Sequence, residues 1–118
     1  AKDHAESFLM LESGRASAFM MDDILLAGEK SKAKEPAKWH IVGTAPIHEI
    51  YGCMMRKGDT EFKQVVDDAI KATYASGEIN AMYKKWFESP IPPKNVNLNF
   101  PMSDDIKALI ATPHDKDE

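Results

Sequence analysis

The chain has 118 residues with a formal net charge of −4, and 43% of its residues are hydrophobic. This length suits one domain with a modest core, and the hydrophobic share excludes a disordered chain, in which low hydrophobicity accompanies a large net charge. The mild acidity argues against a nucleic-acid binder, and no apolar run reaches the roughly 18 residues that span a bilayer. Because the chain begins with Ala1 rather than Met, we expect its N-terminus to result from processing, cleavage or design.

The first part of the chain predicts the order helix, strand, helix. Asp3 can accept hydrogen bonds from the free N–H groups of a short helix while Glu6 reaches back to the N–H of the cap residue itself. Gly14 ends this helix, since glycine readily takes the left-handed conformation that follows a helix. Residues 15–21 are apolar at their centre and predict a strand covered on both faces. A second helix begins near Asp22.

The remaining chain predicts two more strands and three more helices. The strands are expected over 39–42 and 50–55, and the helices over 59–76, 79–87 and 103–110. Strands that alternate with helices indicate an α/β fold with a layered sheet. Three short strands make a thin sheet, however, which suggests that part of the fold is missing.

Asp22 is the first candidate for a binding residue. It follows the predicted strand 15–21, and ligands of open α/β sheets bind beyond the carboxyl ends of strands. A carboxylate there can receive an ammonium group through charge-assisted hydrogen bonds. Alternatively, Asp22 or Asp23 simply caps the following helix, and the local pattern leaves both interpretations open.

His4 is the second candidate, because a helix N-terminus favours an anion and a histidine can donate a hydrogen bond to a carboxylate. The alternative is an exposed histidine without a function. We expect His40, His48 and His114 to be structural or solvated, because they show no metal-binding pattern. Cys53 lies in an apolar stretch that supplies no base to activate a thiol, so we expect it to be buried or to have once formed a disulfide. The sequence predicts no catalytic residue, no metal site and no cofactor.

Several sequence segments resemble the periplasmic solute-binding proteins of polar amino-acid ABC transporters, most closely the glutamate/aspartate-binding branch. They are Lys2-Asp3-His4, the unit L-x-x-G-R-x-x-A-x-x-x-D over 11–22, the stretch YGCMMRK over 51–57, and Trp86-Phe87 followed by PIPPKN over 90–95. The resemblance covers nearly the whole chain.

This resemblance implies a type II periplasmic-binding-protein fold, in which two α/β lobes joined by crossovers close on an amino acid. Residues 1–44 would be the C-terminal part of the second lobe, 45–50 a crossover, 51–93 the C-terminal part of the first lobe, and 94–118 a C-terminal arm with a short helix. Two such lobes need roughly 200 residues or more, so the chain would be a C-terminal portion and incomplete as a monomer.

The resemblance also implies a function: a periplasmic protein that delivers glutamate or aspartate to ABC permease subunits. Asp22 would hold the ligand's α-ammonium group and His4 would lie near its side-chain carboxylate. We expect the chain alone to bind weakly or not at all, and the apolar helix faces over 62–74 and 79–87 to drive homo-oligomer formation. The alternatives are a self-associating fragment without activity and an enzyme of the same fold, such as a dehydratase.

Overall fold

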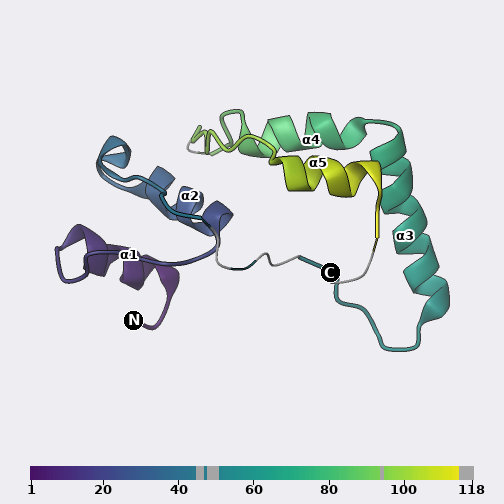
Figure 1. The fold of residues 1–118 in the computed structure, drawn as a ribbon, viewed down its shortest axis with the longest axis horizontal. Coiled ribbons are helices and arrows are strands. Elements are labelled where there is room, and N and C mark those ends of the chain that lie inside the picture. The colour runs from purple at the N-terminus through teal and green to yellow at the C-terminus, as the bar shows by residue number, and fades with distance from the viewer. Residues whose placement is uncertain (45–46, 48–50, 94, 115–118) are drawn as a thin grey trace.

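The computed structural model describes residues 1–44, 47, 51–93 and 95–114. The N-terminal part contains α1 (His4–Glu12), α2 (Asp23–Lys32) and the short 3-10 helix η1 (Pro36–Lys38), with α1 and η1 both packed against α2. These elements lie together at the left of Figure 1.

Local contacts explain where α1 begins. The Asp3 carboxylate accepts a hydrogen bond from the Glu6 N–H at 2.8 Å, which confirms Asp3 as the cap. The Glu6 carboxylate accepts from the Lys2 N–H at 2.6 Å, one residue before the cap, so the predicted return contact to the N–H of Asp3 is wrong.

The end of α1 also follows the prediction. Gly14 has φ +73° and its N–H donates to the Leu11 carbonyl at 3.1 Å, while the Arg15 N–H donates to the Met10 carbonyl at 2.9 Å. These two bonds form a Schellman motif, which satisfies carbonyl groups that the helix itself leaves without donors.

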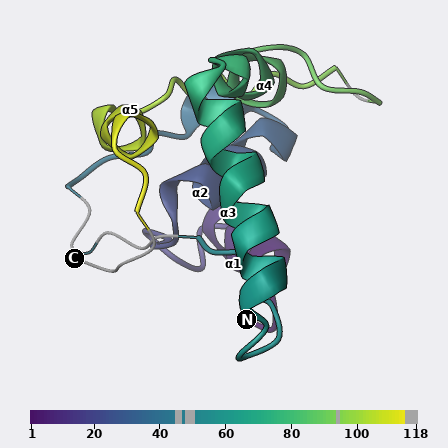
Figure 2. The ribbon, with the colours of Figure 1, turned by 90° about the vertical axis from the view of Figure 1, so that its right-hand side faces the viewer.

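The C-terminal part contains α3 (Thr60–Ala75), α4 (Glu78–Phe87) and α5 (Asp104–Ala111). Asp59 and Ser103 cap α3 and α5 by accepting hydrogen bonds from backbone N–H groups three residues further on. Gly77, at φ +75°, separates α3 from α4, and the two helices pack at this corner. Figure 2 shows α3 in the foreground, rising toward the end at which α4 begins.

The predicted strands are not formed by the residues that the structure describes. Segments 15–21, 39–42 and 51–55 are not helical and have no ladder of hydrogen bonds to a neighbouring segment, and residue 50 lies outside the described residues. Across the described ranges, the single β-type pairing joins Ile91 and Val96. The α/β sheet is therefore a wrong prediction for this chain on its own. An apolar stretch shows what a strand could bury, but a strand also needs a partner for its backbone.

The hydrophobic core is small and divided. Among the described residues, the buried hydrophobic ones are Phe8, Ala27 and Tyr83. Phe8 meets the Trp39 ring edge-on at 5.5 Å in the first group, and Tyr83 lies 4.5 Å from the Phe87 ring in the second. The predicted single core is thus replaced by two small clusters.

Two global measures agree with this incomplete core. The accessible surface is 9685 Å², against about 6,400 Å² for a compact chain of this mass. The radius of gyration is 17.2 Å, against about 13.5 Å for a compact domain of this length. Among the described helices, none combines the length and the apolar character that crossing a membrane requires.

Candidate functional site

Asp22 stands at the start of α2 but does not cap it with its side chain. Its backbone carbonyl accepts the first helical bond, from the Leu26 N–H at 2.9 Å, while its carboxylate makes no cap hydrogen bond. The neighbouring carboxylate of Asp23 accepts from the Ile24 N–H at 2.7 Å. The interpretation of Asp22 as a side-chain cap is therefore wrong, and its carboxylate is available for another partner.

That partner is Tyr51, whose hydroxyl donates a hydrogen bond to Oδ2 of Asp22. The two residues are 29 positions apart in sequence, so the contact joins the start of α2 to the segment that precedes α3. Asp22 is half-buried, whereas Tyr51 is 70% exposed. Among the described residues, the Asp22 carboxylate accepts this one hydrogen bond, through Oδ2. Its other oxygen, Oδ1, is therefore free to accept a hydrogen bond from a ligand.

Sequence reasoning gave Tyr51 no role. Tyr51 is the first residue of the stretch YGCMMRK, on which the resemblance partly rests. The feature that could have indicated its role is a phenol directly after the predicted crossover at 45–50. Such a phenol can hydrogen-bond a carboxylate at the end of a strand. That signal is weak, because a tyrosine in an apolar stretch more often serves packing.

His4 is the first residue of α1 and is exposed. The helix N-terminus beside it already has two carboxylates, since Asp3 caps it and Glu6 binds the Lys2 N–H. No contact between His4 and Asp22 is found within the described ranges. The structure therefore joins Asp22 with Tyr51 and does not bring His4 into the same contact.

The other candidates do not form a site. Cys53 is a free, exposed thiol, so of the two expectations for it, burial is wrong, while a former disulfide stays a prediction. His40 and His114 are exposed, and His48 lies outside the described residues. In the part of the chain that the structure describes, no three metal-ligating side chains come together.

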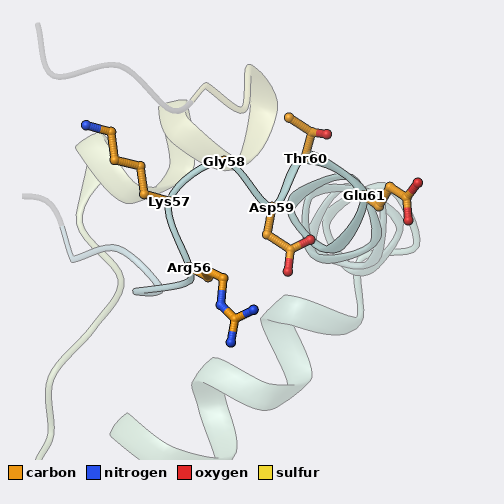
Figure 3. A pocket seen from close by; sticks show the side chains of 6 residues that line it. All are labelled: Arg56, Lys57, Gly58, Asp59, Thr60 and Glu61. Atoms are coloured by element: carbon orange, nitrogen blue, oxygen red, sulfur yellow. The ribbon is translucent and has the colours of Figure 1, made fainter.

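Two shallow hollows occur away from the candidate residues. One, of about 410 Å³, lies over the turn at residues 56–61, and the other, of about 470 Å³, lies between the end of α1 and the segment around Trp39. In Figure 3 the side chains of Arg56 and Lys57 point away from each other, and Glu61 points to the opposite side of the helix start. Side chains that diverge cannot converge on one ligand. Neither hollow includes Asp22 or His4.

Comparison with known proteins gives clear relatives. The family described as "Bacterial extracellular solute-binding proteins, family 3" matches residues 3–89. The chain is 67% identical over 116 residues to an L-glutamate/L-aspartate-binding protein of Pseudomonas aeruginosa, which covers 98% of the chain and 38% of that relative. It is 59% and 58% identical, with the same coverage, to glutamate/aspartate import solute-binding proteins of Salmonella typhimurium and Escherichia coli.

These matches confirm the resemblance seen in the sequence, and they favour a binding protein over an enzyme. The chain spans 38% of the length of these curated relatives. The family match extends over most of the chain, from residue 3 to residue 89. The chain therefore belongs to the bacterial extracellular solute-binding proteins of family 3.

Proposed function

We propose that this chain is the C-terminal portion of a periplasmic glutamate/aspartate-binding protein that delivers acidic amino acids to the membrane subunits of an ABC permease. The observation that carries the proposal is the 67% identity, over 98% of the chain, to a protein named for binding both amino acids. In this proposal the chain supplies parts of both lobes of a type II fold: 1–44 belong to the second lobe and 51–93 to the first. Residues 45–50 cross between the lobes, and 94–118 form an arm.

Asp22 is the proposed partner of the ligand's α-ammonium group. Its carboxylate is not used in capping and lies at the beginning of α2, where the Tyr51 hydroxyl binds one oxygen and leaves the other open. An ammonium group on that second oxygen would form a short, charge-assisted hydrogen bond. The Tyr51 contact supports this role because it fixes the rotation of the carboxylate without neutralising its charge.

His4 is the proposed neighbour of the ligand's side-chain carboxylate. It belongs to α1, which packs against α2, the helix that Asp22 begins. Its exposure leaves the imidazole able to donate a hydrogen bond to a bound anion. Glutamate and aspartate each carry one ammonium and two carboxylate groups, so this pair would bind two of the three charges.

The chain alone should bind neither amino acid with useful affinity. An ion pair open to water contributes about 1 kcal/mol, whereas micromolar affinity needs about 8 kcal/mol. Isothermal titration of this chain with glutamate should therefore show no micromolar binding, with the full-length Escherichia coli relative as positive control. Micromolar binding by the chain alone would contradict this part of the proposal.

The function itself is tested by exchanging the matching segment of the Escherichia coli relative, 116 residues long, for this chain. The chimera should bind glutamate and aspartate at micromolar concentrations. In the chimera, Asp22→Asn should weaken binding by about 30-fold or more, because it removes one partner of a desolvated charge pair. Asp23→Asn is the matched control, since the Asp23 carboxylate bonds the Ile24 N–H. A chimera that folds but does not bind, or that binds equally well with Asp22→Asn, would disprove the proposal.

A further inference from the structure

The carboxylates of Asp22 and Asp23 are neighbours in sequence but have different kinds of partner. The Asp23 carboxylate accepts a hydrogen bond from the Ile24 N–H at 2.7 Å, so its partner lies one residue away. The Asp22 carboxylate makes no cap hydrogen bond at the start of α2, and its Oδ2 accepts from the Tyr51 hydroxyl, 29 positions away. The orientation of the Asp22 side chain therefore depends on a residue outside α2.

The exposure of Tyr51 separates this hydrogen bond from core packing. The Tyr51 side chain is 70% exposed, whereas Asp22 is half-buried. Removing the hydroxyl of an exposed ring leaves no cavity behind, so Tyr51→Phe keeps the ring and deletes the donor alone. The effect of the hydroxyl on Asp22 can therefore be measured without disturbing a core.

We propose that Tyr51 is a positioning residue for the ligand's α-ammonium group: its hydroxyl holds Oδ2 of Asp22 and leaves Oδ1 for the ammonium group. This inference rests on the proposed function, in which Asp22 binds that group. A carboxylate that is already held loses less rotational freedom when the ligand binds, and the cost of immobilising a side chain counts directly against affinity. The ligands that gain from Tyr51 are thus acidic amino acids with a free α-amino group.

A neutral donor suits this position better than a charged one. When a site closes on its ligand, water leaves the carboxylate, and a carboxylate oxygen without a donor then destabilises the complex. The Tyr51 hydroxyl supplies a donor to Oδ2 that does not depend on water. A lysine or arginine in its place would pair with the negative charge and compete with the ammonium group. The phenol satisfies one oxygen and keeps the charge for the ligand.

The place of Tyr51 in the chain suits a bond that persists while lobes move. Tyr51 directly follows residues 45–50, which cross between the lobes in the proposed division, and Asp22 belongs to the segment 1–44. Displacement in a rotation grows with distance from its axis, so groups beside a crossover move least when two lobes close. The bond between Tyr51 and Asp22 can therefore exist before the ligand arrives, as preorganisation requires.

The first test is glutamate binding by the chimera in which this chain replaces the matching segment of the Escherichia coli relative. Tyr51→Phe should raise the dissociation constant by about 5-fold, the effect of losing one hydrogen bond of ordinary strength. When Asp22→Asn is also present, Tyr51→Phe should change it by less than about 2-fold, because the charge that Tyr51 positions is gone. When Asp23→Asn is present instead, the full effect should remain, since Asp23 bonds the Ile24 N–H. Tyr74→Phe, which removes a phenol hydroxyl from α3, is the matched control and should leave binding unchanged.

The results distinguish this inference from the function on which it rests. If the chimera folds but does not bind glutamate, or if Asp22→Asn leaves binding unchanged, the proposed function fails and the role of Tyr51 fails with it. If Asp22→Asn weakens binding but Tyr51→Phe does not, the positioning role alone is overturned. It is also overturned if Tyr51→Phe weakens binding equally with and without Asp22→Asn, because the effect of Tyr51 would then not pass through Asp22.

The second test uses the 118-residue chain itself and needs no ligand. In nuclear magnetic resonance spectra, Tyr51→Phe should shift the side-chain carboxyl carbon signal of Asp22, because the carboxylate loses its donor. The corresponding signal of Asp23 should stay in place, since its donor is the Ile24 N–H. An unchanged Asp22 signal, or equal shifts at both residues, would overturn the proposal.

Discussion

The hydroxyl of Tyr51 donates a hydrogen bond to the carboxylate of Asp22 across 29 positions of sequence. This contact ties the start of α2 to the segment that leads toward α3, and it engages the carboxylate that the sequence marked as a binding group. A phenol in this place restrains the carboxylate while keeping its negative charge. The contact therefore links the arrangement of the chain to the function that we propose for Asp22.

The strength of this contact is measurable through a double-mutant cycle. Tyr51→Phe removes the donor, Asp22→Asn removes the charge of the acceptor, and the double variant gives the coupling energy between them. A hydrogen bond to a charged group that remains open to water should give a coupling of about 1 kcal/mol in the free energy of unfolding, measured with urea. As a control, Tyr51→Phe combined with Asp23→Asn should give no coupling, since Asp23 bonds the Ile24 N–H.

Alkaline pH should destabilise the folded chain around α4 through Tyr83. Burial, followed by the negative charges of Glu88 and Asp23, raises the pKa of the Tyr83 phenol above its usual value of 10.0. A group whose pKa is raised in the folded state stabilises that state fully at pH values below its unfolded pKa. This stabilisation is lost as the pH rises through the folded pKa. The free energy of unfolding should therefore fall above pH 10.

The variant Tyr83→Phe isolates this effect. It should reduce the loss of stability at high pH, and the difference in tyrosinate absorbance between the two proteins should titrate above pH 10. Identical alkaline profiles for the two proteins would show that Tyr83 does not contribute. Helical circular dichroism measures the folded fraction at each pH.

Two glycines should respond in opposite ways to replacement by alanine. Gly14 has φ +73° at the end of α1, so Gly14→Ala should lower the free energy of unfolding by about 1 kcal/mol. Gly28 lies inside α2, where an added Cβ would meet no atom within 4 Å, so Gly28→Ala should raise it by about 0.5–1 kcal/mol. Thermal unfolding of both variants measures the contrast, and a shift of the same sign in both would contradict it.

Amide hydrogen exchange should distinguish residues 51–55 from the helices. Residues 51–55 lie outside the helices and have no ladder of backbone hydrogen bonds to another described segment, and Met54 is 100% exposed. Their amides should exchange at nearly the rate of an unfolded chain, whereas those in the middle of α3 should be slowed. Protection at 51–55 equal to that in α3 would mean that this segment is paired with another strand in solution.

Much of the helical structure could be predicted because it depends on residues close in sequence. Asp59 and Ser103 cap their helices through N–H groups three positions away, and Gly77 provides the left-handed residue between α3 and α4. Each of these caps and turns is formed by residues a few positions apart, so its formation requires neither a partner strand nor a second lobe. The resemblance to solute-binding proteins was visible in the same way, as short motifs along the chain.

The strands, and burial as one of the two expectations for Cys53, were predicted wrongly for one physical reason. An apolar stretch such as 51–55 becomes a strand only when another backbone lies beside it, and its side chains become buried only when another layer covers them. The described part of the chain provides neither, so residues 51–55 form no strand and Cys53 is exposed.

By itself, the sequence determined the five α-helices, the caps of α1, α3 and α5, and the family, because each of these depends on neighbouring residues or short motifs. Only the tertiary structure decided that Tyr51, rather than the start of α2, engages the Asp22 carboxylate, and that Tyr83 is buried while Phe62 stays exposed. Both outcomes depend on contacts between residues far apart in the chain. Such contacts follow from how the elements pack, which residue spacing does not specify.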